Sequence, residues 1–347
     1  MTAEEIKLRQ LTNQSLIMQS DKITVARSLC GIQAQFFPNV LHSLKIRCRD
    51  FRKETSGEGL VKNWTLRGTV HAFAQEDLPL FLDEQNYRSN RWEAPNYWNQ
   101  RKDWAMTSQR QRDLSSVILQ ALAEGEKSRE ELKSLCREQG ITDAEEASMF
   151  HPWGGGIRQL CERGFLHYKV QEQKVFCLSP EVMPLPQEEA GLELARRYFA
   201  SFGPATVHDA MYFFRTTASQ VKKWLSQLPV SSFEWDGRSY FFIENGMAYE
   251  ENIPSCIFLA GFDQLVLGYE KKESLYLRPE DMRSVFNLAG IVMPSLLLNG
   301  EIVGKWKAKN GTLTIYPFRH LSQAHIAVVK DKAETLWPDI QKIKIEE

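Results

Sequence analysis

Two glutamines, Gln33 and Gln35, stand two residues apart in the segment GIQAQFFPN at residues 31–39. Glutamine has no titratable proton, but its amide oxygen accepts hydrogen bonds and its NH2 group donates them. Such a pair could place a water molecule and face a developing positive charge. Glutamines at a helix end are, however, usually only solvated surface. Whether the pair forms a functional site or only solvated surface must be judged from the rest of the sequence.

The geometry of the pair sets a condition on any joint role. The pattern predicts a helix over 22–35, capped by Asp21, and a further helix after Pro38. Residues two apart on a regular helix do not share a face. Both amides therefore reach one ligand only if the helix ends or bends near Gln35, which Pro38 favours because it disfavours helical geometry at Phe37.

A series of helices followed by a β-hairpin recurs along the chain, and this order is typical of a winged helix. Asp21, Thr206 and the Ser128–Glu131 pair are expected to cap helices. The first round consists of helices over 3–18, 22–35 and after Pro38, followed by strands in VKNWTLRGTVHAFA and a helix from Leu78. The second round has helices over 113–124, from Ser128 and over 154–163, followed by the hairpin FLHYKVQEQKVFCL. The third round has helices in GLELARRYFASFG, VHDAMYFFR and QVKKWLSQL, followed by the hairpin SSFEWDGRSYFF with an Asp236-Gly237 turn.

The C-terminal part, from about residue 250, has a sequence pattern that differs from that of the three rounds before it. Asn299-Gly300 and Asn310-Gly311 are strong hairpin turns, so this part is expected to be rich in β-strands and to close with a helix. We therefore predict an α+β fold of three tandem winged helices and a β-rich C-terminal domain. The expected domains are 1–110, which holds the Gln-x-Gln motif, then 111–185, 186–248 and 249–347.

Composition and charge narrow the class of protein. The net charge of −1 excludes the broad electrostatic footprint of a non-specific nucleic-acid binder. Positive charge gathers locally in KIRCRDFRK, which contains Lys45, Arg47, Arg49, Arg52 and Lys53. Such a run is most often a solvated helix end.

The sequence predicts a soluble protein. The N-terminal sequence MTAEEIKLRQ lacks the features of a signal peptide, and no apolar run is long enough to span a bilayer, so we expect a cytoplasmic protein without membrane contact. The scattered cysteines have no metal-ligand spacing and are interpreted as reduced structural thiols. No Walker A, GxSxG, HExxH or Rossmann motif is present, and the glycines of HPWGGG are expected to permit a tight helix entry.

Five segments together resemble the AlkZ-like, or YcaQ-like, winged-helix DNA glycosylases. They run in the same order over nearly the whole chain: GIQAQ, WTLRGTVHAFAQEDLPLFL, FGPATVHDAMYFF, AGFDQLVLGYEKK and LLLNGEIVGKWK. The resemblance implies hydrolysis of the N-glycosidic bond of alkylated purines, with interstrand crosslinks as substrates of some members. It also implies that Gln33-Ala34-Gln35 is the catalytic signature, in which a glutamine and an aliphatic residue precede glutamine or aspartate.

The implied chemistry suits two amides. An N7-alkylated guanine is already cationic, so it leaves as a neutral base with little acid catalysis. The remaining tasks are to place a water at C1′ and to tolerate positive charge on the sugar, which are positioning and electrostatics. The expected enzyme is a monomer without cofactor or metal that acts on double-stranded DNA.

Other residues are weaker candidates for contact with DNA. Arg47 and Arg49 belong to the basic segment, and Arg67 and His71 match the family stretch TLRGTVH. Lys305, Trp306 and Lys307 lie on a predicted hairpin, where the alternative is a Trp that covers the core beside solvated lysines.

Three further positions stay open between a functional and a structural role. Asp263 is either a catalytic acid or a buried carboxylate that ties a loop. Trp92, Tyr97 and Trp98 either stack on bases or simply pack. The alternative function for the whole chain is a DNA-binding or regulatory winged-helix protein without enzyme activity, which would bind methylated DNA but release no base.

Overall fold

The computed structural model describes residues 1–246, 249 and 252–346. The chain forms two compact units, one made of Met1–Ser56 with Leu192–Glu347 and the other of Gly57–Gly191. Residue 248, at the predicted 248/249 domain boundary, lies outside the described residues. None of the described helices combines the length and apolar character that crossing a lipid bilayer requires.

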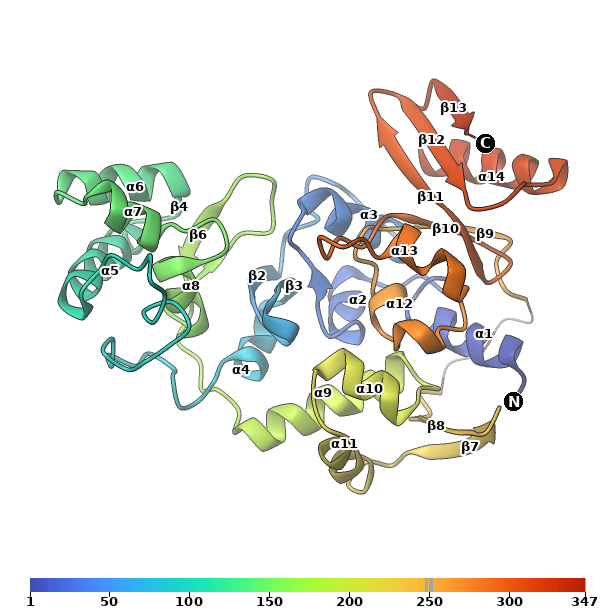
Figure 1. Ribbon diagram of the computed structural model, residues 1–347, viewed down its shortest axis with the longest axis horizontal. Helices are drawn as coiled ribbons and strands as arrows, with labels where there is room; N and C mark the ends of the chain where they lie inside the picture. Colours follow the sequence, from blue (N-terminus) through green and yellow to red (C-terminus); the bar gives the residue numbers. More distant parts are fainter. Residues whose placement is uncertain (247–248, 250–251, 347) are drawn as a thin grey trace. The chain divides into compact units, whose positions relative to one another are not determined.

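The first unit contains the Gln-x-Gln segment and the β-rich C-terminal part (Figure 1). Its helices and strands, in chain order, are α1 (Ala3–Asn13), α2 (Lys22–Ser28), β1 (Ile32–Gln33), α3 (Phe37–Arg47), the C-terminal part of α9 (Gln187–Ser201), α10 (Val207–Phe214), α11 (Ala218–Leu225), β7 (Ser231–Trp235), β8 (Arg238–Phe242), β9 (Cys256–Leu259), α12 (Gln264–Leu267), α13 (Met282–Val285), β10 (Ser295–Leu298), β11 (Glu301–Lys309), β12 (Thr312–Pro317), α14 (Gln323–Leu336) and β13 (Lys342–Ile345).

Five strands of this unit form a sheet in the order β13-β12-β11-β10-β9. The pairs are antiparallel except β12 with β13, which is parallel, and the β10–β11 register shifts between Leu296 and Leu297. The side chains of Phe258, Leu296 and Trp306 pack with Val329 of α14 in one apolar core. Helix α3 packs against this core.

The second unit consists of Gly57–Gly191 and has its own core. Its helices and strands are β2 (Leu60–Trp64), β3 (Val70–Ala74), α4 (Leu78–Phe81), α5 (Ser108–Ala123), β4 (Lys127–Ser128), α6 (Arg129–Glu138), α7 (Asp143–Met149), α8 (Gly155–Glu162), β5 (Leu166–Tyr168) and β6 (Val175–Leu178). The strands follow the order β3-β2-β5-β6-β4, so the hairpins of the first two predicted rounds join in one sheet.

The hairpin predictions are confirmed. Both residues of each turn, Asp236-Gly237, Asn299-Gly300 and Asn310-Gly311, have positive φ, as the tight turn between twisted strands requires. The hairpin β5–β6 also forms where the sequence predicts it.

The predicted caps are confirmed as well. Asp21 caps α2, while Ser128 with Glu131 and Thr206 with Asp209 form capping boxes on α6 and α10. The glycines of HPWGGG permit the entry into α8, since Gly154 has φ of 141° and Gly155 has φ of 61°. The first helix is shorter than predicted, because α1 ends at Asn13 and Ser15 adopts φ of 59°.

Candidate active site

Helix α2 ends well before the two glutamines, which corrects the prediction of a helix over 22–35. The helix stops at Ser28, and Cys30 (φ 52°) and Gly31 (φ 93°) follow in the left-handed region. The Gly31 N–H donates to the Ala26 carbonyl at 2.8 Å, which closes the last turn. Two successive left-handed residues cannot continue a right-handed helix, so the chain leaves in an extended form.

The extended form removes the geometric objection to a joint role of the two amides. Gln33 is the last residue of β1, and the chain re-enters a helix only at Phe37. Gln33 and Gln35 therefore do not lie on one regular helix, whose geometry would place their side chains on different faces. Gln33 is buried and Gln35 is exposed, with Ala34 buried between them.

The side-chain amides of both glutamines are available for hydrogen bonds to a ligand. In the described part of the chain, no hydrogen bond holds the side-chain amide of Gln33 or of Gln35. Ala34 is 2% exposed and Gln33 is 6% exposed, so both side chains lie in the interior, whereas Gln35 is exposed. The two amides offer two acceptor oxygens and four N–H donors from neutral groups that do not change with pH.

A turn from a distant part of the chain holds the start of this segment. Gln264, at the first position of α12, donates from Nε2 to the Gly31 carbonyl at 3.0 Å and is 1% exposed. Its neighbour Asp263 caps α12 by accepting from Leu265 N at 3.0 Å. Gly261 lies so close to Asn39 that a Cβ there would approach its side chain to 2.9 Å. The turn at 260–264 therefore packs directly against the start of α3.

The same turn holds the far end of α3 through a buried ion pair. Arg47 Nη2 lies 2.6 Å from Asp263 Oδ1, and Nη1 lies 3.0 Å from Oδ2, with both side chains fully buried. Arg47 Nε also donates to the Gln14 carbonyl, and Nη1 donates to Ser43 Oγ. The expected DNA contact of Arg47 is therefore corrected, because its guanidinium is enclosed. Both Asp263 oxygens are likewise occupied, which favours the role of a carboxylate that ties a loop over that of a catalytic acid.

A histidine fixes the middle of α3 to the sheet. His42 Nε2 donates to the Phe258 carbonyl at 2.7 Å, and its ring lies 4.7 Å from the ring of Trp306 and 5.5 Å from that of Trp337. Burial lowers the pKa of His42 to about 4, so the ring is neutral near pH 7. Helix α3 is thus held at its beginning, middle and end.

We expect Gln264→Leu to slow base release without preventing DNA binding. The change removes the donor to the Gly31 carbonyl, a bond worth about 1 kcal/mol, and lets the segment that carries Gln33 shift. Single-turnover release at saturating enzyme should fall about tenfold, because small misplacements of catalytic groups are costly. The buried Gln159, which accepts from Gln111 in the other unit, provides a matched Gln159→Leu control. An equal loss of rate in both variants, or none in Gln264→Leu, would contradict this role.

The hairpin β11–β12 separates the three residues expected to contact DNA there. Trp306 is buried, and its Nε1 donates to the Leu259 carbonyl at 2.9 Å, so the prediction of a DNA contact by Trp306 is corrected in favour of the core alternative. Lys305 Nζ lies 5.8 Å from the centre of the Tyr316 ring, and Lys307 is exposed. The alternation of a β-strand places the lysines on the face opposite to Trp306.

His71 is also internal. It is fully buried, its Nδ1 donates to Thr65 Oγ1 at 2.8 Å, and its Nε2 accepts from Arg67 Nη2 at 3.0 Å. Burial, and then the charge of Arg67, hold the pKa of His71 well below its usual range. His71 is therefore a neutral anchor for Arg67 and is not available to a phosphate, while Arg67 itself is half-buried with φ of 59°.

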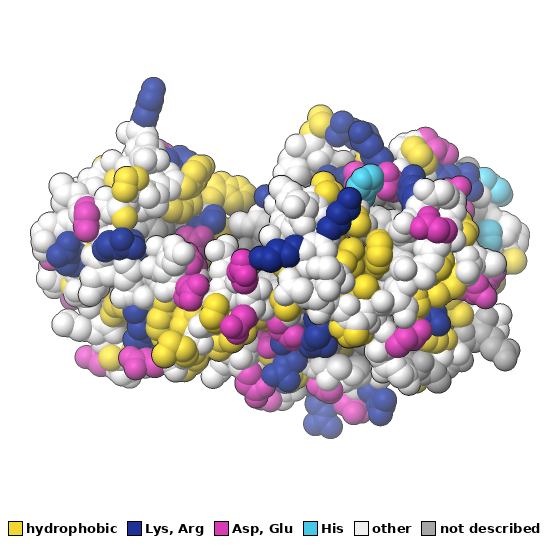
Figure 2. All heavy atoms as spheres, turned by 90° about the horizontal axis from the view of Figure 1, so that it is seen from below, with side chains coloured by type: hydrophobic (Ala, Val, Ile, Leu, Met, Phe, Trp, Pro, Cys, Tyr) yellow, Lys and Arg dark blue, Asp and Glu magenta, His cyan; other side chains and the backbone are white. Residues whose placement is uncertain are grey.

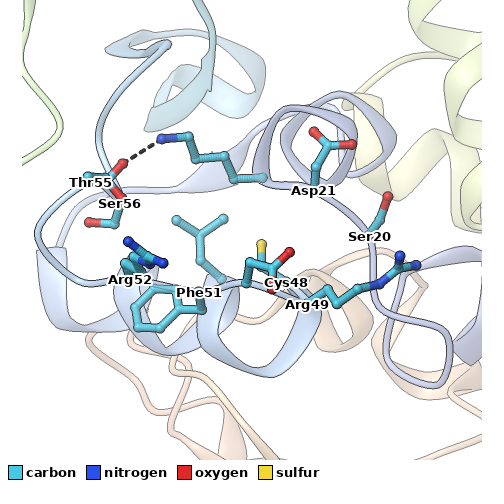
Figure 3. Close-up of a pocket in the computed structure, with 11 residues that line it drawn as sticks. Ser20, Asp21, Cys48, Arg49, Phe51, Arg52, Thr55 and Ser56 are labelled. Carbon is cyan, nitrogen blue, oxygen red and sulfur yellow. Dashed lines mark hydrogen bonds between the residues drawn. The ribbon is translucent and has the colours of Figure 1, made fainter.

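The basic segment after α3 borders a pocket of about 400 Å³ (Figure 3). Arg49 and Arg52 line it together with Lys22, whose Nζ donates to the Thr55 carbonyl. Arg49 Nη2 donates only weakly, at 3.3 Å, to the Gln19 carbonyl, and both arginines are exposed. The carboxylates of Asp21 and Asp50 also border the pocket, which keeps its net charge modest. On the face drawn in Figure 2, basic and acidic side chains are likewise interspersed.

The three aromatic residues Trp92, Tyr97 and Trp98, expected either to stack on bases or to pack, differ in their burial. Trp92 and Trp98 are buried, and Trp92 belongs to the core of the second unit. Tyr97 is 68% exposed. Packing therefore accounts for the two tryptophans, while the exposed Tyr97 ring lies edge-on to Trp98 and has the Arg101 guanidinium 5.8 Å from its centre.

Comparison with known proteins decides the family. The model of the family described as DNA glycosylase AlkZ-like matches residues 26–337. The chain belongs to the AlkZ-like DNA glycosylases. A relative from Streptomyces sahachiroi, described as an interstrand DNA cross-link repair glycosylase, is 24% identical over 336 residues, with 89% of this chain and 88% of that protein covered.

A solved structure, that of the Streptomyces sahachiroi DNA glycosylase AlkZ, shares the α+β fold. It superposes with a TM-score of 0.76 at 21% identity and covers 99% of this chain and 98% of its own. The span matched by the AlkZ-like family model includes Gln33, Gln35, Arg47 and the turn at 260–264. The expected family and its enzyme class, a DNA glycosylase, are confirmed.

Proposed function

We propose that this AlkZ-like glycosylase hydrolyses the N-glycosidic bond of cationic N7- or N3-alkylpurines in double-stranded DNA. The observation that carries the proposal is the presence of two uncommitted amides, Gln33 and Gln35, where a catalytic acid or base would be expected. Asp263 has both oxygens occupied, and His42 is neutral and internal. Such a site is poorly equipped to protonate a neutral leaving base, so it suits a base that is already positively charged.

The bond changes follow from that charge. As the C1′–N9 bond breaks, its electron pair moves to the purine and neutralises the cation, while positive charge develops on the sugar. An amide oxygen accepts a hydrogen bond from the attacking water and faces this charge, and the water proton passes to solvent after the new C1′–O bond forms. The NH2 groups donate to sugar or phosphate oxygens.

We assign the contacts with the DNA backbone to basic residues whose side chains are exposed or partly exposed. Arg49, together with Lys22 and Arg52 at their shared pocket, supplies cations for phosphate oxygens, and so do Lys305 and Lys307. Arg67, oriented by His71, is a further candidate. Interstrand crosslinks are included among the proposed substrates because the Streptomyces sahachiroi relative is described by that activity. We also retain three winged helices as the arrangement behind the three hairpins.

Release of base from a single-lesion duplex tests the proposal. With a duplex that contains one 7-methylguanine, we expect free base in the supernatant and an alkali-labile abasic site in equal amounts. A duplex with neutral hypoxanthine at the same position should react at least about a hundredfold more slowly, because its leaving group needs protonation. Comparable rates on both lesions, or binding without any release, would contradict the proposal.

A further inference from the structure

Phe36 is an exposed aromatic residue that directly follows Gln35. Its side chain is 47% exposed, and among the described residues of the first unit it is the one Phe, Tyr or Trp side chain classed as exposed. Its ring stacks on that of Phe262, with centroids 5.9 Å apart and planes at 28°. One face of the ring is thus supported, while much of the side chain remains open to solvent.

Phe36 stands at a position where most of the described helices carry a capping side chain. Phe36 is the N-cap of α3 and makes no cap hydrogen bond. Side-chain oxygens serve this purpose at Thr2, Asp21, Thr107, Ser128, Thr142, Thr206, Thr217, Asp263 and Ser322, whereas α4, α8 and α13 also begin without a side-chain cap. An aromatic ring at an N-cap gives up that bond without gaining burial. Residues that break a local rule in this way concentrate at functional sites.

The supporting ring is itself fixed in place. Phe262 is 6% exposed and adopts φ of 56°, a region that bulky residues rarely occupy. Its N–H donates to the Val292 carbonyl at 3.1 Å, and the next two residues are the anchors Asp263 and Gln264. The turn that holds the Gln33–Gln35 segment therefore also holds the aromatic support beneath Phe36.

We propose that Phe36 stacks on the alkylated purine and recognises its positive charge. This inference rests on the proposed function and adds the residue that selects the substrate. The face of an aromatic ring is electron-rich, so it attracts a delocalised cation such as an N7-alkylpurine more strongly than the neutral purine of the same shape.

This attraction belongs to binding rather than to bond cleavage. The base loses its charge as the C1′–N9 bond breaks, so the contact with Phe36 weakens along the reaction. An interaction that is not stronger in the transition state does not accelerate the chemical step. Phe36 therefore acts on affinity, whereas Gln33 and Gln35 act on the rate of cleavage.

The test compares a charged base with a neutral one of the same shape. One duplex carries 7-methylguanine on a 2′-fluoroarabino sugar that resists hydrolysis, and the other carries 7-methyl-7-deazaguanine on the same sugar. The measured quantity is the ratio of the two dissociation constants by fluorescence anisotropy. We expect Phe36→Leu to reduce the preference for the charged duplex by about threefold to tenfold, and Phe36→Trp to retain or raise it. Single-turnover cleavage of an ordinary 7-methylguanine duplex at saturating enzyme should change less than the ratio.

A matched control separates this role from general packing. Phe233 on β7 is also stacked on a second ring, that of Tyr240, with centroids 5.6 Å apart, so Phe233→Leu removes a comparable contact elsewhere. An unchanged ratio in Phe36→Leu, or an equal fall in Phe233→Leu, overturns the inference. Because the ratio is a binding measurement, failure of this inference is distinguished from failure of the proposed function, which shows as absence of base release by the unaltered enzyme.

Discussion

Replacement of both Gln33 and Gln35 by alanine should abolish release of 7-methylguanine while DNA binding is largely kept. The two amides are the uncommitted polar groups of the extended segment, and their proposed partners are the attacking water and the developing sugar cation. Removal of a single preorganised group of this kind typically lowers the rate about 10²–10³-fold. The double variant should therefore fall near the uncatalysed rate, as measured by single-turnover release of free base.

The single variants sharpen this expectation. Gln35→Asp should keep more activity than Gln35→Ala, because a carboxylate still accepts a hydrogen bond from water and faces a cation. Neither change at Gln35 should lower thermal stability appreciably, because its side chain is exposed and no hydrogen bond in the described part of the chain holds its amide. Gln323→Ala, at the exposed start of α14, is the control and should release base at the normal rate. Full activity of the double variant would remove Gln33 and Gln35 from the mechanism.

Local signals in the sequence were enough to predict the hairpins and caps. Asn299-Gly300 forms its turn because both residues tolerate positive φ, and Ser128 caps α6 because its hydroxyl reaches the Glu131 N–H. Each of these features involves residues within a few positions of one another. The same holds for the alternation along β11 that separates Trp306 from its flanking lysines.

The end of α2 shows a signal that was present but weak. Gly31 is a typical residue just beyond a helix C-terminus, yet Ile32 and Ala34 continue an apolar pattern. Strand β1 has only two residues, too few for alternation to reveal it. Helix and strand patterns are ambiguous over such short apolar runs.

The anchors of the candidate site could not be predicted from sequence spacing. Arg47 looks like part of a solvated basic run, and only the fold brings it to Asp263, 216 positions away. The donor bond from Gln264 to Gly31 spans 233 positions. The available hint was an Asp-Gln pair inside the apolar stretch AGFDQLVLG, because buried polar residues need partners.

Asp263→Ala should destabilise the first unit strongly. The change leaves the Arg47 guanidinium fully buried without its counter-charge, and breaking a buried pair in this way costs about 3–5 kcal/mol. It also removes the cap of α12 and frees the end of α3. We expect a large drop in the urea midpoint followed by circular dichroism, together with slower base release as the segment that carries Gln33 loses its support.

Two further variants separate charge from capping and packing. Asp263→Asn keeps a side-chain oxygen that can cap α12 but removes the charge, so most of the loss should persist if the pairing with Arg47 dominates. The double variant Arg47→Met/Asp263→Leu removes both charges at similar volume and should recover part of the stability, because no buried charge is then left without its counter-charge, although the cap of α12 is still lost. If Asp263→Asn were as stable as the unaltered protein, the loss in Asp263→Ala would come from the missing cap of α12 rather than from the missing charge beside Arg47. In that case the turn at 260–264 would act on the Gln-x-Gln segment chiefly through Gln264 and its bond to the Gly31 carbonyl.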